Sequence, residues 1–399
     1  MYAFNKSIEG NLYNMFLNLV KRRNPALIDT AITLHQKGIL LPDTYVLDLD
    51  VITENAKKMR DKARSLDIEL FYMSKQFGRN PLVAKVIHEQ GIEKAVVVDY
   101  KEALVMMRAG LPIGNVGHLV QIPIHLLERI IDYGAEYITV YSMEMLDQIN
   151  KVALKLNKIQ KVLLKVVDHK SDLYHGQYGG FFLRDMETSI HNIKKLSNVK
   201  IAGITAFPCF LYDEKQEALL PTNNAKTLKK AEDLLNAEGI DISVINMPSA
   251  TCSLTIPFIN QLGGTQGEPG HALTGTTPLH AIRDLDELPA MVYLSEISHS
   301  FDGKSYMYGG GYYRRGHLKN AIVDNGIHRN TMKVEAFEND SIDYYLELDG
   351  ECDLGASVLT SFRTQIFVTR SDVAIVSGIQ SGHPKLEGIY NSLGDKIRR

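Results

Sequence analysis

Eight short apolar segments alternate with amphipathic stretches through the middle of the chain. The apolar segments cover residues 69–73, 95–98, 117–122, 137–140, 162–167, 201–207, 242–247 and 263–268. Short buried strands separated by helices pair in parallel, because a parallel pair needs a crossover connection. Eight such units in about 200 residues match the number and length of a closed (β/α)8 barrel, and an open doubly wound sheet has the same local pattern. We therefore predict an α/β fold built on a TIM barrel.

The regions on either side of this repeat have other patterns. Up to residue 38, apolar residues from Leu12 to Val20 recur at helical spacing, and Asn24-Pro25 begins a second helix. Beyond residue 283, glycines and charged turns separate strand-like segments at 291–297, 321–323, 344–348, 357–359, 364–369 and 373–376. We predict an N-terminal helical segment (1–40) with no assigned role, a barrel (41–285) and a C-terminal all-β domain (286–399).

The composition limits the class of protein. Of the 399 residues, 45% are hydrophobic and 23% are charged, so the chain can bury a core. A formal charge of −3 excludes a dedicated nucleic-acid binder, which has a basic surplus. The three cysteines lie far apart without metal-ligand spacing, as is typical of a reducing compartment. No apolar run approaches the ~20 residues that cross a bilayer, and no signal pattern is present. We expect a cytoplasmic protein without a membrane, nucleic-acid or metal partner.

The residues after the first barrel strand are the first candidates for chemistry, because barrel enzymes act at the carboxyl ends of their strands. Lys75 follows the segment 69–73 almost directly, and Asn80-Pro81 is a suitable start for the next helix. A lysine here is either a solvated side chain or an amine that forms a Schiff base.

The residues after the last two strands are suited to an anion. Gly267, Gly270 and Gly275 make a loop whose N–H groups can approach a phosphate closely, and such a site is common at this place in barrels. Ser249 and Thr251, after the seventh strand, offer hydroxyls to the same phosphate. Ser249 can also serve as the N-cap of the following helix.

Together these motifs resemble the fold-type III pyridoxal-phosphate enzymes, the alanine racemase and ornithine decarboxylase-like superfamily. Lys75 stands where the Schiff-base lysine of that family lies. The segment 44–50, followed by a helix, is similar to the family's entry segment. Glu268-Pro269-Gly270 matches the decarboxylase motif, and the loop through Gly275 matches the racemase motif. The segments 74–81, 117–123 and 308–317 are most similar to the bacterial branch called YhfX.

The resemblance implies pyridoxal 5'-phosphate as cofactor and a role for Glu268 at its pyridine nitrogen. Alanine racemases have an arginine there, whereas a carboxylate keeps a proton on the nitrogen. The ring then becomes a strong electron sink, which delocalises a carbanion at the substrate Cα as a quinonoid. Racemisation, decarboxylation and retro-aldol cleavage all pass through such a carbanion.

The resemblance also implies the other cofactor-binding residues. Many relatives stack a histidine on the ring after the sixth strand, where this chain has Ala206, so the stack is missing or is supplied by Phe207 or His118. A C-terminal tyrosine reaches the phosphate in relatives. The expected cofactor-binding set is Lys75, Asp99, His118, Ser249, Thr251, Glu268, Gly270, His271 and Tyr390.

A racemase needs an acid/base group on each face of Cα. Lys75 serves one face, and in this family the partner subunit's β domain serves the other, which implies a homodimer. Tyr308, before Gly309-Gly310-Gly311, is the candidate by position, although a tyrosine in a strand can simply pack across the sheet. Cys352-Asp353 resembles the Cys-Asp pair of decarboxylases, and a turn aspartate beside a buried cysteine explains it equally well.

We therefore expect a pyridoxal-phosphate-dependent racemase, an isomerase, that acts on a free amino acid, with Lys75, Tyr308 and Cys352 as catalytic candidates. The first alternative is an amino-acid decarboxylase, a lyase, which would release carbon dioxide. The second is a non-catalytic regulatory protein that carries the cofactor. Relatives of that last kind lack the β domain, and its presence here favours catalysis.

Overall fold

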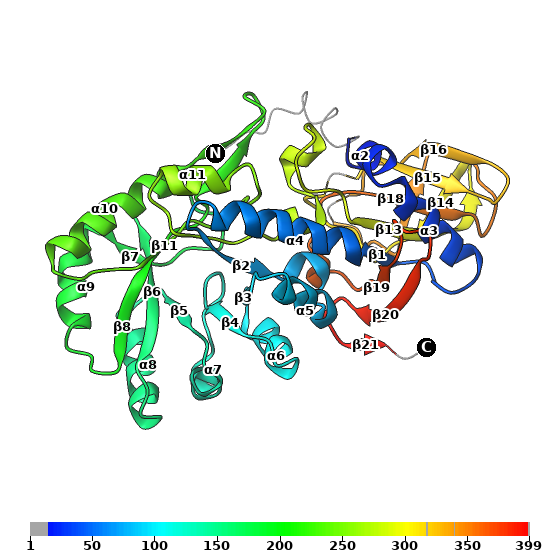
Figure 1. The fold of residues 1–399 in the computed structure, drawn as a ribbon. Coiled ribbons are helices and arrows are strands. Elements are labelled where there is room, and N and C mark those ends of the chain that lie inside the picture. Colours follow the sequence, from blue (N-terminus) through cyan, green and yellow to red (C-terminus); the bar gives the residue numbers. More distant parts are fainter. Residues whose placement is uncertain (1–14, 317, 339, 398–399) are drawn as a thin grey trace. The chain divides into compact units, whose positions relative to one another are not determined.

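The computed structural model describes residues 15–316, 318–338 and 340–397. These residues form two compact units, each described here by itself (Figure 1). The barrel unit contains residues 56–74 and 84–270. The sheet unit contains the described residues up to 55, residues 75–83, and the described residues from 271 onward. The two units are therefore interleaved along the chain, which the predicted division at residues 40 and 285 did not anticipate.

The barrel unit is a closed ring of eight parallel strands. In ring order they are β2 (Glu69–Met73), β3 (Lys94–Val97), β4 (Ile113–Val116), β5 (Tyr137–Val140), β6 (Gln160–Val167), β8 (Val199–Thr205), β11 (Val244–Asn246) and β12 (Gln266–Gly267). The pairing of β5 with β6 closes the ring, and β7 (Phe181–Phe182) adds to β6. The predicted (β/α)8 barrel is confirmed.

Helices connect the strands and lie outside them (Figure 1). They are α4 (Leu49–Arg64), α5 (Pro81–Glu89), α6 (Tyr100–Arg108), η2 (Ile124–Leu126), α7 (Leu127–Tyr133), α8 (Met143–Lys155), η3 (Leu183–Asp185), α9 (Met186–Ile193), α10 (Asn223–Ala237) and α11 (Ile256–Gln261). A hairpin of β9 (Phe210–Asp213) and β10 (Ala218–Pro221) precedes α10. Helix α8 is typical: Ser142 caps its first turn, and its buried face carries Leu146 and Ile149.

The interior of the barrel shows which side chains point inward. Phe71, Tyr137, Leu163 and Val244 belong to one buried cluster, and the Phe71 and Tyr137 rings stack 6.2 Å apart. Burial of each such side chain stabilises the fold by roughly 2–3 kcal/mol. Because side chains alternate along a strand, residues two positions after these also point inward, toward the carboxyl ends of the strands.

The third barrel strand differs from the prediction. The apolar run 117–122 is not a strand; β4 ends at Val116, and Gly117 turns the chain with a φ of 86°. A Cβ on Gly117 would lie 2.7 Å from the Thr139 carbonyl oxygen, so the turn requires glycine. The apolar run is thus the loop after the strand, and it brings His118 to the carboxyl end of the barrel.

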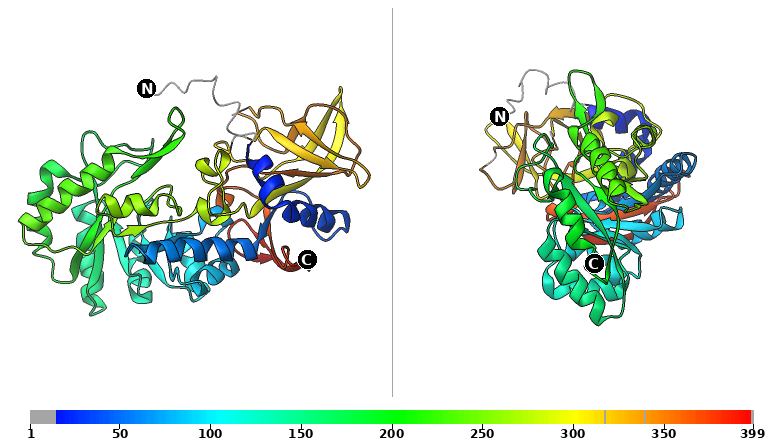
Figure 2. Two further views of the ribbon diagram at one scale, coloured as in Figure 1. Left: turned by 45° about the horizontal axis from the view of Figure 1, so that its top comes forward. Right: turned by 90° about the vertical axis from the view of Figure 1, so that its left-hand side faces the viewer.

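The sheet unit contains a ten-stranded sheet. Its strands are β1 (Thr44–Asp48), β13 (Met291–Phe301), β14 (Lys304–Tyr308), β15 (Asn320–Asp324), β16 (Arg329–Lys333), β17 (Tyr345–Leu348), β18 (Ser357–Thr360), β19 (Asp372–Ser377), β20 (Lys385–Asn391) and β21 (Lys396–Ile397). Strand β1 pairs antiparallel with β13 and parallel with β19, so residues 44–48 join this sheet and not the barrel. The yellow to orange strands of this sheet lie side by side in Figure 2.

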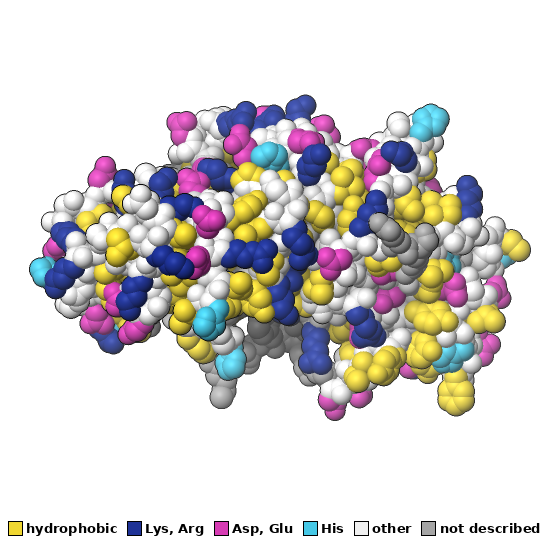
Figure 3. Space-filling model, turned by 90° about the horizontal axis from the view of Figure 1, so that it is seen from below, with side chains coloured by type: hydrophobic (Ala, Val, Ile, Leu, Met, Phe, Trp, Pro, Cys, Tyr) yellow, Lys and Arg dark blue, Asp and Glu magenta, His cyan; other side chains and the backbone are white. Residues whose placement is uncertain are grey.

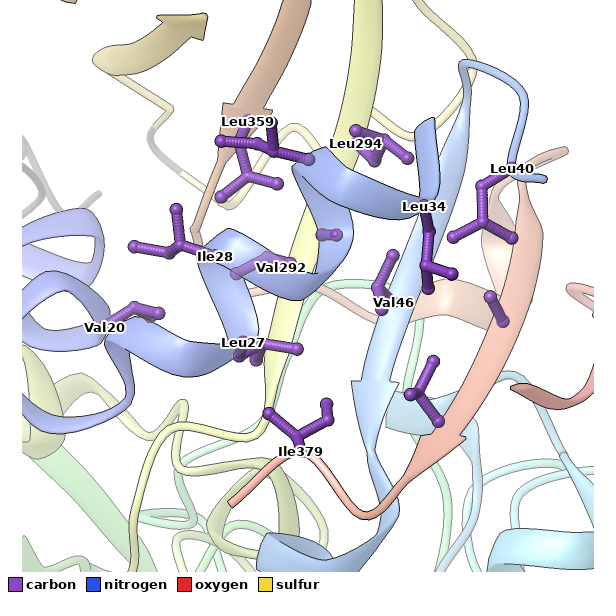
Figure 4. Packing of buried hydrophobic residues seen from close by; sticks show 14 of the residues in the cluster. Val20, Leu27, Ile28, Leu34, Leu40, Val46, Val292, Leu294, Leu359 and Ile379 are labelled. Atoms are coloured by element: carbon purple, nitrogen blue, oxygen red, sulfur yellow. The ribbon is translucent and has the colours of Figure 1, made fainter. Parts of the chain in front are cut away.

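The N-terminal helices α2 (Met15–Arg23) and α3 (Pro25–Gln36) pack against this sheet. Leu27 and Ile28 of α3 contact a core that contains Val292 and Leu359 (Figure 4). Asn24 caps α3 by accepting a hydrogen bond from the Leu27 N–H at 3.3 Å. The helical segment therefore has a structural role as a cover for the sheet, whereas Leu12 lies outside the described residues.

The sequence pattern missed part of this unit. The predicted strand 364–369 is instead η6 (Ile366–Val368), and β14, β16, β20 and β21 were not predicted. Strand β16 reads Arg-Asn-Thr-Met-Lys and is mostly exposed, so it lacks the alternation that marks a half-buried strand. Two further 3-10 turns, η4 (His271–Thr274) and η5 (Pro278–Ala281), precede β13.

The surface carries charges of both signs. On the face in Figure 3, Lys and Arg side chains lie among Asp and Glu side chains, as expected for a net charge of −3. Within residues 15–397, apart from 317 and 339, no helix is both long and apolar enough to span a membrane.

Candidate active site

Glu268 is the central charged group of the barrel unit. It directly follows β12, and its side chain is fully buried. Its Oε1 accepts a hydrogen bond from the Asn246 Nδ2 at 3.1 Å, and its Oε2 lies 3.5 Å from the His118 Nε2. Its backbone N–H donates to the Thr251 Oγ1 at 3.0 Å. A buried carboxylate costs several kcal/mol unless donors face it, and here the Asn246 amide supplies a donor while the His118 ring lies beside the other oxygen.

The orientation of the Asn246 amide is fixed by its other partners. Its Oδ1 accepts from the Thr205 hydroxyl at 2.7 Å, and its Nδ2 also donates to the Gln266 Oε1 at 2.9 Å. Gln266 in turn donates through Nε2 to the Glu69 Oε2 at 2.8 Å. These partners fix which amide atom of Asn246 is oxygen and which is nitrogen. Asn246 therefore presents its N–H to Glu268, which favours the ionised carboxylate.

His118 lies beside Glu268 and Phe207. Its ring packs edge to face with the Phe207 ring at 5.5 Å, and its carbonyl oxygen accepts from the Tyr141 hydroxyl at 2.5 Å. Ala206, which precedes Phe207 in the chain, is buried. The two side chains proposed to replace the missing histidine of relatives therefore contact each other at the carboxyl end of the barrel.

The loop after β11 has an unusual backbone. Ser249 has a φ of 93° and Ala250 a φ of 53°, values that L residues rarely adopt. The Ser249 hydroxyl donates to the Phe210 carbonyl at 2.8 Å, and Thr251 is buried. Helix α11 begins only at Ile256 with Thr255 as its N-cap residue, so Ser249 is not the N-cap. Backbone held in this region concentrates at ligand-binding loops.

The loop after β12 is equally tight. A Cβ on Gly267 would lie 2.9 Å from the Ile259 Cδ1 and 3.0 Å from the Thr251 Cγ2, so only glycine lets these loops approach. Pro269 accepts a hydrogen bond from the Met73 N–H at 2.9 Å, and Gly270 is buried. The two loops place hydroxyls and backbone groups side by side at the end of the barrel.

Asp99 has a local structural role. It is the N-cap of α6, where its side chain accepts from the Glu102 N–H at 2.9 Å. The Glu102 carboxylate in turn accepts from the Ser74 hydroxyl and the Val98 N–H. This geometry accounts for Asp99 without a ligand.

In the sheet unit, Lys75 and His271 lie in short 3-10 turns that contact each other. Lys75 begins η1 (Lys75–Phe77), is 8% exposed, and follows Met73 of β2 by two residues along the chain. Burial lowers the pKa of His271 well below its usual value, and the charges of Arg363, Lys75 and Arg315 lower it further. The imidazole is therefore neutral near pH 7. Its Nδ1 lies 3.2 Å from the Thr276 hydroxyl, and its buried Nε2 has no hydrogen-bond partner among the described protein groups.

Tyr308 and Tyr390 lie in different parts of the sheet. Tyr308 ends β14, is half-buried, and its ring centre lies 5.8 Å from that of Tyr345. Tyr390 lies in β20 opposite Val373, and burial raises the pKa of its hydroxyl. These contacts do not test the prediction that Tyr308 is an acid/base group or the prediction that Tyr390 contacts the phosphate.

Cys352 packs inside the sheet unit. Its Sγ lies 3.1 Å from the Met332 Sδ, and its N–H donates to the Ser305 hydroxyl at 2.8 Å. Burial raises the pKa of the thiol, so the reactive thiolate is disfavoured. The neighbouring Asp353 accepts from the Asn325 Nδ2 at 2.6 Å. Local packing thus accounts for both members of the Cys-Asp pair.

The donor set of each unit fits pyridoxal phosphate. The barrel unit offers a buried carboxylate that suits a pyridinium N–H, and hydroxyls and tight loops that suit a phosphate. The sheet unit offers the Lys75 amine and a neutral imidazole with the unsatisfied Nε2 of His271. Pyridoxal phosphate has an aldehyde, a phosphate and a pyridine nitrogen, and these groups suit the three.

The sequence analysis missed Lys165. This lysine lies in β6 two residues after the inward-facing Leu163, and it is 3% exposed. Burial lowers the pKa of its amine to about 8. The signal was present in the sequence, since a lysine interrupts the apolar run 162–167 at an inward position.

Comparisons with known proteins agree with the fold. A family model described as alanine racemase, N-terminal domain, matches residues 47–278, and one described as YhfX-like, C-terminal domain, matches residues 292–386. The chain is 46% identical over 385 residues to the uncharacterized protein YhfX of Escherichia coli, covering 96% of this chain and 100% of the relative. It is 27% identical to alanine racemase of Clostridium tetani over 280 residues, or 68% of each chain.

Three solved structures share the fold. Alanine racemase of Clostridium difficile has a TM-score of 0.62 at 18% identity, covering 89% of this chain and 100% of its own. D-threonine aldolase of Filomicrobium marinum has a TM-score of 0.63 at 16% identity, covering 88% and 95%. D-threo-3-hydroxyaspartate dehydratase of Delftia sp. has a TM-score of 0.64 at 15% identity, covering 87% and 97%.

Proposed function

The chain belongs to the alanine racemase-like, fold-type III family of pyridoxal-phosphate proteins, and from this premise we propose that it is a racemase of a free amino acid. The observation that carries the proposal is the buried Glu268 carboxylate, which accepts from Asn246 at 3.1 Å. A buried anion with a fixed donor is suited to hold a proton on a heterocyclic nitrogen. That arrangement favours reactions in which Cα carries negative charge.

The cofactor, when bound, supplies a ring that accepts the electron pair left at the substrate Cα. Lys75 would hold the cofactor aldehyde covalently and, once displaced by the substrate amine, would take the proton from Cα or return it. Glu268 would accept a hydrogen bond from the pyridine N–H, and Asn246 would keep Glu268 ionised. His118 and Phe207 would exclude water from the carboxylate.

The phosphate would be held by the loops after β11 and β12. Gly270 would offer its backbone N–H, and Ser249 and Thr251 their hydroxyls. His271 is neutral, so with its Nδ1 accepting from Thr276 its Nε2 can donate to a phosphate oxygen. Tyr390 remains a proposed contact to the same group.

The second face of Cα would be served by Tyr308 from a partner subunit, which makes the proposed assembly a homodimer. The position of Tyr308 at the end of β14, before three glycines, supports this role. A cytoplasmic location is proposed as well, and the three unbridged cysteines support it.

Decarboxylation is the weaker alternative. The Cys352 thiol that would protonate Cα in a decarboxylase packs on Met332 and has a raised pKa. The fold is also shared with an aldolase and a dehydratase, so cleavage of the Cα–Cβ bond and loss of a β-hydroxyl are alternatives to include in any assay. A protein that only carries the cofactor would need none of the acid/base groups.

The absorbance spectrum is the first test. We expect a visible band after addition of pyridoxal phosphate, its removal by borohydride, and its absence in Lys75→Ala.

The second test is NMR in D2O with a panel of L-amino acids. We expect loss of the Cα–H signal and formation of the D enantiomer, without carbon dioxide or aldehyde. A colourless protein would exclude the family's cofactor, and carbon dioxide release would favour the decarboxylase.

A further inference from the structure

Lys165 occupies a special position in the barrel. Its strand β6 is four strands from β2 in either direction around the ring, so it lies on the wall opposite the strand that leads to Lys75. Leu163 of β6 points into the core of the barrel, so Lys165 points inward one layer closer to the carboxyl ends. The amine therefore lies at the end of the barrel where function is expected.

The surroundings of the amine are aromatic and mostly uncharged. The Lys165 Nζ donates to the Gln177 carbonyl oxygen at 3.2 Å and lies 4.3 Å from the centre of the Tyr141 ring. Gly179 and Gly180 let the covering loop approach, because a Cβ would lie 2.7 Å from the Tyr141 ring and from the Lys165 carbonyl oxygen, respectively. The Tyr141 hydroxyl donates to the His118 carbonyl, so Lys165 is linked to the group around Glu268.

The charge of Lys165 is not balanced within the described part of the chain. Those residues place no Asp or Glu oxygen within 4.0 Å of its Nζ, although a buried ammonium normally has a carboxylate partner. Lys161, on the same strand, is the contrast: it also lies over a tyrosine ring, at 5.6 Å from Tyr137, but it is exposed and pairs with Glu136 at 3.5 Å. An ammonium has three donors, and only one is used by the Gln177 carbonyl.

We propose that Lys165 binds the carboxylate of the amino-acid substrate. The inference rests on the racemase proposed above and adds the group that would hold the substrate's carboxylate. The cofactor phosphate is not the expected anion, because the loops suited to it follow β12, which pairs with β2, and β11, the strand next to β12. A small monoanion fits a single ammonium against an aromatic ring better than a dianion does.

Binding should depend on the ionisation of Lys165. A carboxylate near the ammonium favours its charged form, so ligand binding raises the pKa of Lys165 above about 8. By linkage, carboxylate affinity should fall about tenfold per pH unit once the pH exceeds the pKa of the free protein.

The decisive experiment is an NMR titration of the wild-type holoprotein labelled with [ε-13C]lysine. Propionate is the probe, because it carries a carboxylate but no amine that can react with the cofactor. Lys165→Met assigns the Lys165 resonance. We expect propionate to raise the midpoint of that resonance by at least one pH unit. A lysine spectrum in which propionate moves no midpoint would overturn the inference, and this outcome needs no assignment.

Variants then test the energetic effect. Lys165→Met should raise the dissociation constant of propionate about 10- to 100-fold, because a charged hydrogen bond is lost. Lys161→Met, the matched control on the same strand, should leave it within twofold. Equal weakening in both would indicate general charge screening and contradict the assignment. Circular dichroism checks that both variants are folded.

Three further ligands identify which carboxylate is held. An amino acid and its amide differ only at the α-carboxylate, so a preference for the acid that disappears in Lys165→Met assigns Lys165 to that group. A dicarboxylic amino acid that alone shows this dependence would assign Lys165 to a side-chain carboxylate. If propionate binding requires Lys165 but no amino acid exchanges its Cα–H, the racemase proposal fails and the anion site remains. If exchange occurs equally in Lys165→Met, this inference fails and the racemase remains.

Discussion

Each unit holds a carboxylate away from full contact with solvent: Glu268 is fully buried in the barrel unit, and Asp43 is half-buried in the sheet unit. Glu268 in the barrel unit faces the Asn246 amide and the His118 ring. Among the described residues, the Asp43 carboxylate in the sheet unit accepts hydrogen bonds from the hydroxyls of Tyr293, at 2.9 Å, and of Ser371. Burial raises the pKa of Asp43 to about 6, and Asp343 contributes to this shift. Glu268 thus faces an amide N–H that is held in place, whereas Asp43 has a raised pKa and tolerates its charge poorly.

The carboxylate of Asp43 contacts a glycine loop of the sheet unit, which suggests a structural role. A Cβ on Gly310 would lie 1.9 Å from the Asp43 Oδ2, so the carboxylate packs directly on the glycine loop after Tyr308. Asp343 accepts from the N–H groups of Gly310 and Tyr312 at 3.1 and 3.2 Å. Asp43 and Asp343 therefore fix the glycine loop after Tyr308. In the barrel unit the roles are reversed, because the Asn246 amide fixes the Glu268 carboxylate. Three substitutions test this difference.

The largest effect is expected from Asn246→Asp. The change replaces an N–H donor by a carboxylate oxygen opposite Glu268, so one of the two groups must take a proton. Removal of a preorganised donor typically slows a reaction 100- to 1,000-fold, so we expect Cα–H exchange to fall by about 100-fold or more. The absorbance spectrum of the bound cofactor should shift as well, which a purely structural defect would not cause.

Asn115→Asp is the matched control. Asn115 accepts from the Thr139 hydroxyl at 2.9 Å, much as Asn246 accepts from Thr205, but it lies in β4. Exchange within a few-fold of wild type is expected. Equal losses in both variants would show that any interior carboxylate is harmful and that Glu268 has no special dependence on Asn246.

The next effect concerns Gly310→Ala. The added methyl would overlap Asp43, and Gly310 has a φ of 126°, which alanine adopts poorly. We expect the free energy of unfolding to fall by about 2–4 kcal/mol, measured by urea denaturation. Gly303→Ala, at a φ of 75° with open space around it, should cost only about 1 kcal/mol. A smaller loss at Gly310 than at Gly303 would mean that the carboxylate does not fix the loop.

The smallest and most specific effect is the pH dependence of Asp43→Asn. The pKa of Asp43 is about 6 in the folded state and about 3.9 when unfolded, so the folded state binds the proton more tightly. The wild type should therefore lose stability relative to the variant as the pH rises from about 4 to about 6, by up to about 3 kcal/mol. Urea denaturation at pH 4.5, 5.5 and 7.5 measures this. A difference that stays constant over that range would refute the raised pKa.

The sequence predicted the parts of the fold that depend on local pattern. The segments 69–73 and 137–140 are β2 and β5, and Asn24 and Asn80 cap α3 and α5 as expected. Residues 44–48 have the pattern of any buried strand, and only contacts with residues about 250 and 330 positions later assign them to the sheet.

The candidate site was predictable where a motif marks the chemistry and less so where packing decides. Glu268 was proposed because it begins a Glu-Pro-Gly motif, and His118 because it could replace the stacking histidine that this chain lacks. Asn246 was not proposed as a donor to Glu268, since an asparagine at the end of a strand has no distinctive pattern and its partner is 22 residues away. Lys165 interrupts an apolar run in the sequence, but its burial and the absence of a carboxylate partner among the described residues come from the structure.

The interleaving of the two units has a consequence for how this architecture can be rebuilt. The chain leaves the barrel unit after Ser74, spends residues 75–83 in the sheet unit, and returns at Ala84. A gene fusion that joined this barrel to another C-terminal domain at a single junction would leave residues 75–83, with Lys75 among them, without the neighbours they were selected to contact. A chimera should therefore exchange all three segments of the sheet unit together: the residues up to 55, residues 75–83 and the residues from 271 onward. Lys75 belongs to the second of these segments and should be moved with the sheet unit.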